Sequence, residues 1–269
     1  MNIRIGALLF ATVMSVVACG GGVVGGLQGT TISAGKLKYG SPVQFVVNGI
    51  NLDKGVTVTA PSCTNVTKVT DGTATERVFT CIPSVVGPMT MSIVGGGTVL
   101  HTETYTIPVP QIALGTTMGD VVLELDPVAA PLSVKNILQY VNANFYTYLI
   151  FHRVIPGFVI QAGGYDASLN PATTNAAIKL EAGNGLSNLR GTVAMARTAV
   201  ADSATSQFFI NTVDNVSLDT LGGGYAVFGK VVSGMEVVDA ISAVTTGVSN
   251  GMSDVPVTPI LINSMVQIR

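Results

Sequence analysis

Residues 151–164 read FHRVIPGFVIQAGG and lie in the second half of the 269-residue chain. The stretch places one arginine, Arg153, within a run of apolar and aromatic side chains. Three further blocks follow it in order: residues 184–197 (NGLSNLRGTVAMAR), 203–211 (SATSQFFIN) and 225–231 (YAVFGKV). Hydrophobic periodicity alone does not identify a function here, whereas four ordered blocks form a specific pattern.

The four blocks closely resemble the signature segments of the cyclophilin family. Their order and spacing are similar to those of bacterial cyclophilins over residues 111–269. The resemblance implies an eight-stranded antiparallel β-barrel capped by two helices. It also implies rotation about the amide bond that precedes proline. The barrier to this rotation is about 18–20 kcal/mol, because resonance gives the C–N bond partial double-bond character. We therefore expect a peptidyl-prolyl cis-trans isomerase.

Arg153 matches the arginine that this family uses in catalysis. There the guanidinium hydrogen-bonds near the prolyl nitrogen and the preceding carbonyl, and it stabilises the twisted amide. A planar fork of donors that always keeps its charge suits this task better than lysine does. Because the stabilisation is electrostatic and greatest in the transition state, we expect no nucleophile, metal or cofactor. The alternative is a surface arginine without a role in the reaction.

Other matched positions complete the predicted site. By resemblance, Phe158 and Gln161 join Arg153 in catalysis. The predicted substrate-binding residues are Ala196, Arg197, Gln207, Phe209, Leu218 and Tyr225. An apolar proline ring requires an apolar wall, which the aromatic members provide. The alternatives are core packing for the aromatic residues and ordinary surface positions for the glutamines. Arg197 belongs to a segment whose backbone pairs with the peptide, so its side chain is not required.

Several nearby residues carry separate expectations. Phe208 is expected in the core, because adjacent strand residues point to opposite faces, and His152 is expected to be structural. Val159 stands where many family members carry Met, which implies a modest change. Ser217 stands where animal members carry Trp and bacterial members often Phe, so we predict weak inhibition by cyclosporin. Tyr225 stands where animal members carry His, and bacterial members commonly have Tyr there.

The residue pattern itself also favours a mainly β fold with two helices in this region. Thr117–Asp120 predicts a hairpin turn between two apolar runs. After Pro131, apolar side chains within residues 134–141 recur at i, i+3, i+4 and i+7, which predicts one helix. Ser233 and Glu236 have the spacing of a capping box and predict the start of a second. Many strands with two isolated helices fit a closed barrel with helices over its ends.

Residues 30–107 predict a separate, small β-sandwich-like domain. An extended segment over residues 43–47 is followed by Asn48-Gly49, which is typical of a turn, and further short strands come after it. The region has a general likeness to bacterial immunoglobulin-like modules but no identifying motif. Its expected role is a spacer or an interaction module. Residues 108–110 (PVP) predict a linker to the second domain, residues 111–269.

Residues 1–19 resemble a bacterial lipoprotein signal. The apolar stretch over residues 5–17 is shorter than the roughly 20 residues that a transmembrane helix needs. Residues 16–19 (VVAC) look like a lipobox, which predicts lipidation of Cys19. The alternatives are an ordinary signal peptide with an incidental cysteine, or a short anchor helix. Residues 20–29 suit a flexible tether. We expect a lipid-anchored protein of the bacterial cell envelope that faces the periplasm, with the outer membrane favoured.

The chain has three cysteines, and one of them, Cys19, belongs to the predicted lipobox. Cys63 and Cys81 are then expected to form a disulfide in an oxidising compartment, and two buried free thiols are the alternative. No ligand spacing predicts a metal site. Charged residues make up only 10% of the chain, and the net charge is −2, which disfavours a nucleic-acid partner. We expect a monomer that binds proline-containing polypeptides and, through its anchor, a membrane.

Three functions are consistent with these observations. The leading hypothesis is an isomerase that assists the folding of exported proteins. The second is a membrane-tethered binding module for proline-containing partners, in which turnover is incidental. The third is a structural surface lipoprotein with a decayed barrel, and the intact set of Arg153, Gln161 and Phe209 argues against it.

Overall fold

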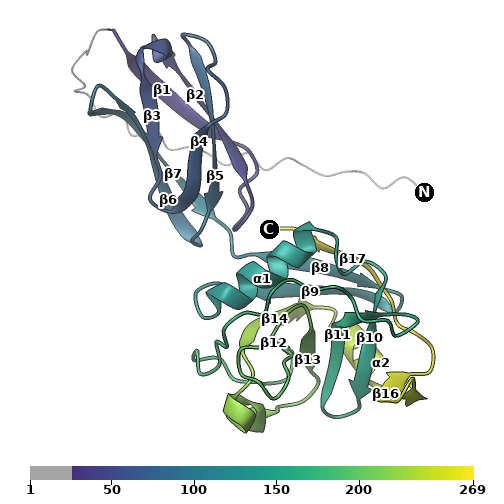
Figure 1. Ribbon diagram of the computed structural model, residues 1–269. Coiled ribbons are helices and arrows are strands. Elements are labelled where there is room, and N and C mark those ends of the chain that lie inside the picture. The colour runs from purple at the N-terminus through teal and green to yellow at the C-terminus, as the bar shows by residue number, and fades with distance from the viewer. Residues whose placement is uncertain (1–25) are drawn as a thin grey trace.

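The computed structural model describes residues 26–269, which form a smaller β-sheet part and a larger barrel (Figure 1). The chain is mainly β, as expected. The predicted signal segment, the predicted lipidation site Cys19 and most of the predicted tether lie outside the described residues. Within residues 26–269, neither helix has the length and apolar character needed to cross a membrane.

Two antiparallel sheets form the N-terminal part. One contains, in order, β1 (Gln28–Ala34), β2 (Val43–Ile50), β5 (Glu76–Pro83) and β4 (Cys63–Lys68). The other contains β3 (Val56–Thr59), β6 (Gly87–Gly95) and β7 (Thr98–Ile107), and the short 3₁₀ helix η1 (Leu52–Lys54) precedes β3. Between the sheets, the rings of Phe45 and Tyr105 lie 5.8 Å apart, centroid to centroid. The two sheets therefore share one apolar core.

The turn predicted at Asn48-Gly49 was wrong. Both residues lie within β2, where Gly49 pairs with Gly29 of β1. A side chain at Gly49 would collide with the backbone carbonyl of Gln28, so glycine here permits a close approach of two strands. The strand ends at Ile50, and the next residue, Asn51, has a positive φ of 54°.

A disulfide joins Cys63 in β4 to Cys81 in β5, and their Cα atoms lie 5.7 Å apart. The two strands are neighbours in the four-stranded sheet. Closing a loop of 18 residues restricts the unfolded chain, which stabilises the fold by about 3 kcal/mol in the chain-entropy model.

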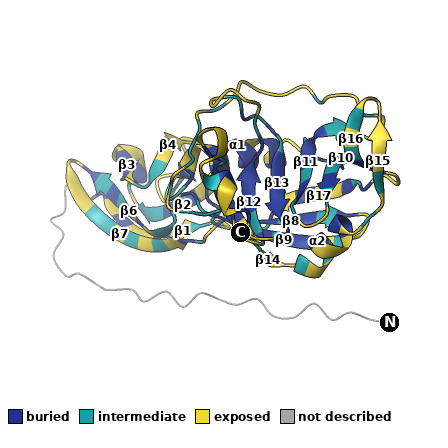
Figure 2. Ribbon diagram, turned by 90° about the horizontal axis from the view of Figure 1, so that it is seen from below, coloured by how far each residue is buried: buried dark blue, intermediate teal, exposed yellow. Residues whose placement is uncertain are grey.

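The C-terminal part is a nearly closed barrel of eight antiparallel strands, and this fold was expected. In sheet order the strands are β10 (Leu149–Ile155), β11 (Val159–Asp166), β13 (Phe208–Asn211), β12 (Thr192–Met195), β14 (Val227–Ser233), β9 (Gly119–Leu125), β8 (Gln111–Thr116) and β17 (Ile262–Gln267). A single bridge, Ile150 to Leu261, links the two ends of the sheet. A small hairpin is formed by β15 (Thr246–Ser249) and β16 (Met252–Pro256). Its strand β16 lies against β10 and is partly buried, whereas β15 is largely exposed (Figure 2).

Two helices, α1 (Pro131–Asn142) and α2 (Met235–Ser242), accompany the barrel. The helix predicted to begin at Pro131 is confirmed, and its apolar face is buried. Its first free N–H groups, at Leu132 and Ser133, donate to the Glu181 carboxylate at 2.8 and 2.7 Å. A carboxylate in this position also complements the helix dipole.

The capping box predicted for the second helix was wrong. Ser233 ends β14, and Gly234 occupies the cap position with a φ of 83° and no side-chain hydrogen bond. A side chain at Gly234 would collide with the backbone of Asp120 in β9. The chain therefore uses the backbone freedom of glycine to turn from strand to helix where no hydroxyl cap fits.

The last barrel strand contacts the N-terminal part directly. The Gln267 side chain is 2% exposed, and its Nε2 donates to the carbonyl oxygen of Tyr39 at 3.0 Å. Ser41 Oγ donates to Gln267 Oε1 at 3.0 Å, and Lys38 Nζ donates to the Gln267 backbone oxygen at 2.6 Å. These bonds fasten the two parts together at the end of β17.

Candidate active site

Cross-strand pairing assigns alternate residues to the two faces of the barrel wall. One row across β10, β11, β13 and β12 is fully buried and fills the interior: Val154, Ile160, Ile210 and Val193. The adjacent row consists of Arg153, Gln161, Phe209 and Ala194. This second row faces outward, because successive strand residues alternate and directly paired residues share a face. The register therefore places Arg153 and Phe209 on one surface.

A chain of polar side chains leads away from Arg153. Its Nη1 lies 3.4 Å from Gln161 Oε1, and Gln161 Nε2 donates to Gln207 Oε1 at 2.8 Å. Gly164 makes room for this chain, since a Cβ there would overlap the Gln207 side chain. Gln161 and Gln207, predicted as a catalytic and a substrate-binding residue, thus form a hydrogen-bonded chain that ends at Arg153.

A carboxylate that the sequence did not predict also approaches Arg153. Asp254 Oδ2, on β16, lies 4.0 Å from Arg153 Nε, and both side chains are partly exposed. Asp254 has a positive φ of 63°, which turns the backbone locally. Because 101 residues separate it from Arg153 in the chain, only the packing of the β15–β16 hairpin on β10 reveals the pair.

The residues predicted to form the apolar slot lie beside this polar chain. A compact cluster, separate from the main core, contains Val159, Ala194, Ala196, Phe209, Leu218 and Val227, with Phe158, Leu186 and Tyr225 packed against it. The Phe209 and Tyr225 rings meet edge to face, with centroids 5.7 Å apart and planes at 75°. The structure therefore brings together the predicted slot residues on the outer face of the barrel. Ser217 is exposed on the 3₁₀ helix η2 (Val216–Asp219), next to Leu218.

A buried network of asparagines, which the sequence did not predict, holds the backbone of both slot walls. Asn215 Nδ2 donates to the carbonyl oxygen of Phe158 at 2.9 Å and to Asn211 Oδ1 at 2.8 Å. Asn211 Nδ2 in turn reaches Asn188 Oδ1 at 3.2 Å. Asn188 Nδ2 donates to the Tyr225 carbonyl oxygen at 3.2 Å. Asn188 and Asn211 lie within two of the quoted blocks and Asn215 lies outside all four, so no sequence pattern marked the network.

The Asn211 side chain is central to this network, so its loss is expected to be costly. Asn211→Leu keeps the approximate volume but leaves hydrogen-bonding groups of Asn188, Thr192 and Asn215 without their partner. We expect the free energy of unfolding to fall by about 3 kcal/mol, because buried polar groups become unsatisfied. Urea unfolding measures this, with exposed Asn175→Leu as the control. A change below about 0.5 kcal/mol, the range of ordinary surface substitutions, would contradict the structural role of the network.

His152 lies next to Arg153 in sequence and is buried where the strand register is irregular, between Phe151 and Arg153. It is 2% exposed, and its ring lies 4.8 Å from that of Tyr165, centroid to centroid. Burial lowers the pKa of His152 to about 4, and the nearby charge of Arg153 adds to the shift, while interactions with Ile150 and Gln207 oppose it. The imidazole is therefore neutral at neutral pH, in keeping with a structural role.

The lowered pKa of His152 predicts a pH-dependent stability. An unfolded histidine takes up a proton below its ordinary pKa of 6.5, whereas the folded protein resists protonation until about pH 4. The unfolded state therefore binds more protons between these values, and stability falls as the pH falls. We expect wild type to lose about 3 kcal/mol over this window relative to His152→Gln, measured by urea unfolding at several pH values. Parallel pH profiles of the two proteins would contradict the assignment.

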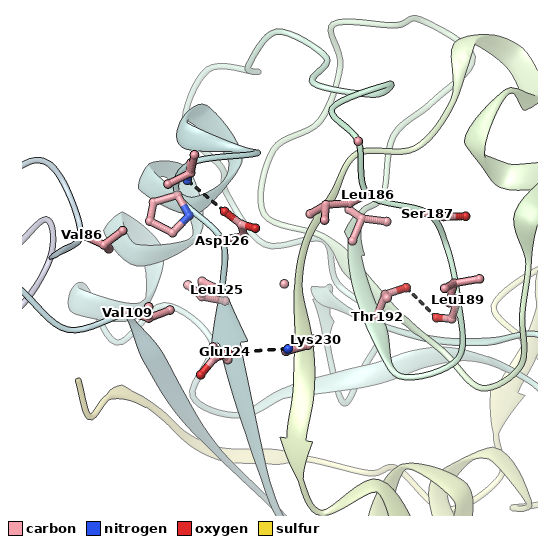
Figure 3. A pocket seen from close by; sticks show the side chains of 15 residues that line it. Val86, Val109, Glu124, Leu125, Asp126, Leu186, Ser187, Leu189, Thr192 and Lys230 are labelled. Carbon is pink, nitrogen blue, oxygen red and sulfur yellow. Dashed lines mark hydrogen bonds and ion pairs between the residues drawn. The ribbon is translucent and has the colours of Figure 1, made fainter.

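A further cavity lies at the junction of the two parts of the chain and shares Leu186 and Val227 with the slot cluster (Figure 3). Its volume is about 650 Å³. Val86 and Val109 line one side, and Leu125, Leu186 and Leu189 are among the residues from the barrel side. The lining also includes a Glu124–Lys230 ion pair at 3.8 Å. Arg153, Phe158 and Phe209 do not line this cavity.

Comparison with known proteins agrees with this geometry. Residues 111–267 match the family model described as cyclophilin type peptidyl-prolyl cis-trans isomerase/CLD. Peptidyl-prolyl cis-trans isomerase A of Dickeya dadantii is 54% identical over 155 residues, which cover 57% of this chain and 82% of that protein. Peptidyl-prolyl cis-trans isomerase B of Escherichia coli is 48% identical over 159 residues, which cover 57% of this chain and 97% of that protein.

Solved structures give the same result. A cyclophilin-type isomerase from Cryptosporidium parvum superposes with a TM-score of 0.50 at 26% sequence identity, and the match covers 60% of this chain and 98% of that one. The eight-stranded barrel, the family match over more than half of the chain and relatives near 50% identity agree. The chain therefore belongs to the cyclophilin family and is a peptidyl-prolyl cis-trans isomerase.

Proposed function

We propose that Arg153 catalyses the isomerisation from the rim of the apolar slot. The proline ring enters between Phe158, Phe209 and the Leu218 segment, so that the preceding amide lies beside the guanidinium. The observation that carries this proposal is the shared outer row, in which Arg153, Gln161 and Phe209 face the same way. A cyclophilin-type isomerase of Cryptosporidium parvum was crystallised in the presence of the dipeptide Ala-Pro, which supports a proline-containing substrate for this chain as well.

The chemistry needs no bond to break. Resonance stiffens the C–N bond, and a prolyl nitrogen that becomes pyramidal loses that resonance. A guanidinium that donates to this nitrogen stabilises the twisted form more than either planar form, which lowers the barrier. Gln161 and Gln207 hold the Arg153 guanidinium in place before the substrate binds, so little reorganisation is needed in the transition state.

The direct experiment is an isomerisation assay on the full chain with short peptides that contain an X-Pro bond. Exchange NMR reports the cis and trans populations and their interconversion without a coupled protease. We expect catalytic amounts of protein to accelerate the exchange well beyond the uncatalysed rate, which is on the order of 0.01–0.1 s⁻¹. Exchange at the rate of buffer alone would reject the proposed site.

We further propose that the enzyme assists the folding of exported proteins from a lipid anchor at Cys19 in the bacterial cell envelope. The lipobox-like residues 16–19 and the Cys63–Cys81 disulfide, which suits an oxidising compartment, support this proposal. Metabolic labelling with a fatty-acid analogue tests it, with Cys19→Ser as the matched control. Labelling that is equal in both proteins, or absent from wild type, would overturn the anchor.

A second candidate is a binding module for proline-containing partners in which turnover is incidental. The observation that favours it is the cavity at the junction of the two parts, which the catalytic residues do not line (Figure 3). Comparing Arg153→Ala with a deletion of residues 30–107 in cells discriminates the two functions. A growth defect from the deletion alone would favour the binding module, whereas a defect from Arg153→Ala favours the enzyme.

A further inference from the structure

The Arg197 side chain makes three of its four hydrogen bonds to the loop that follows η2. Its Nε donates to the Gly224 carbonyl oxygen at 2.9 Å, and its Nη2 donates to those of Gly222 at 2.7 Å and Leu221 at 3.3 Å. Its Nη1 donates to the Thr198 carbonyl oxygen at 2.9 Å. One guanidinium therefore gathers four backbone carbonyls, three of them from a single loop.

The loop of residues 221–224 needs hydrogen bonds from outside the loop to hold its conformation. Residues 221–223 form the one-turn 3₁₀ helix η3, and Gly224 follows it. The three glycines have positive φ angles, 60° at Gly222, 97° at Gly223 and 91° at Gly224. Three consecutive glycines lose much conformational entropy when they are ordered, so the loop has little stiffness of its own. Arg197 supplies hydrogen-bond donors to backbone carbonyls that this short turn does not place in a regular pattern of backbone hydrogen bonds.

The same guanidinium also contacts the slot. Its Cζ lies 4.6 Å from the centroid of the Tyr225 ring, which is a cation–π contact. The Tyr225 ring in turn meets Phe209 edge to face. Arg197 thus reaches the apolar wall through Tyr225, the residue that immediately follows the loop it holds.

We propose that Arg197 is a positioning residue, which fixes the 221–224 loop and the Tyr225 ring and so keeps the slot shaped for proline. This rests on the proposed function of the slot. Lysine cannot replace it, because a single ammonium group lacks the planar fork that spans several carbonyls while stacking on a ring. The charge alone is therefore insufficient, and the geometry of the guanidinium is required.

Substitution tests the proposal on the full chain. Arg197→Lys and Arg197→Ala are expected to raise KM for a short proline peptide about tenfold and to leave kcat within about twofold, because the slot wall contributes binding shared by ground and transition states. Arg77→Lys is the matched control, since Arg77 also holds a loop by its backbone carbonyls, Thr73 and Glu76, but in the N-terminal part. Its KM should equal that of wild type.

Two readouts separate positioning from general stability. The aromatic carbon resonances of Tyr225 should shift in Arg197→Lys, while most of the other six tyrosines stay in place. If Arg197 acts through Tyr225, the double variant Arg197→Ala/Tyr225→Leu should have the KM of Tyr225→Leu alone. Additive effects, an unchanged Tyr225 signal or a wild-type KM in Arg197→Lys would each overturn the proposal. The NMR signature needs no activity, so it separates this proposal from a failure of the isomerase site.

Discussion

Arg153→Ala is expected to lower kcat/KM for isomerisation of a proline peptide by about 10²–10³-fold, with little change in stability. The guanidinium is the charged group that cross-strand pairing places on the face of the slot, in the same row as Gln161 and Phe209. Its side chain is 39% exposed, so the packing of the barrel core does not depend on it. The loss should therefore appear mainly in kcat, measured by exchange NMR at saturating peptide.

Arg153→Lys is the informative companion to that variant. It keeps the positive charge at the rim but lacks the second donor arm that reaches Gln161 Oε1. We expect it to recover only a small part of the lost activity. If Arg153→Ala retained activity within about twofold of wild type, the electrostatic account of catalysis would be wrong.

Truncation of two adjacent phenylalanines is expected to have different effects, one mainly on stability and the other mainly on activity. Phe208 is fully buried in the main core and meets Tyr146 edge to face at 5.7 Å, whereas Phe209 belongs to the slot cluster. Phe208→Ala should therefore lower the free energy of unfolding by about 4 kcal/mol, because it leaves a cavity in a packed interior. Phe209→Ala should lose less stability and should lower kcat/KM at least tenfold, because a ring that contacts proline contributes roughly 1.5 kcal/mol or more.

Urea unfolding and peptide isomerisation on the same two proteins test this pair. The account requires the ranking to reverse between the two measurements, with Phe208→Ala worse in stability and Phe209→Ala worse in activity of the folded protein. Equal stability losses combined with equal activity losses would mean that both rings belong to one core. The predicted slot would then be ordinary packing.

The local sequence was sufficient to predict features that depend on the alternation of side chains along a strand and on the spacing of apolar residues along a helix. Phe208 was assigned to the core because it neighbours Phe209 on a strand, and the structure buries it completely. The helix after Pro131 followed from the spacing of its apolar residues, and its face is buried as predicted. These features are set within a few residues, so a single sequence contains them.

Features that depend on distant backbone were not predictable in this way. Asn48-Gly49 has the composition of a turn, but Gly49 is needed where Gln28 of another strand approaches. Ser233 has the spacing of a cap, but the backbone of Asp120 leaves room only for glycine at the next position. In both cases a tertiary contact overrides a local preference.

The same distinction between local and distant features applies to the candidate site. The row of Arg153, Gln161 and Phe209 is carried by motif residues and could be predicted. The Asn188–Asn211–Asn215 network and the approach of Asp254 could not, because their partners come from separate segments that only the folded barrel brings together. Arg197 was predicted for its backbone, and its side-chain role became visible only with the loop that it holds.

The most direct test of the central claim separates peptide binding from catalysis in one NMR titration of wild type and Arg153→Ala with an X-Pro peptide. If the arginine acts on the twisted amide while the slot holds the ring, Arg153→Ala should bind the peptide with a Kd within about threefold of wild type but should not accelerate its cis/trans exchange. Catalysed exchange at the wild-type rate, or binding that disappears together with exchange, would contradict the claim.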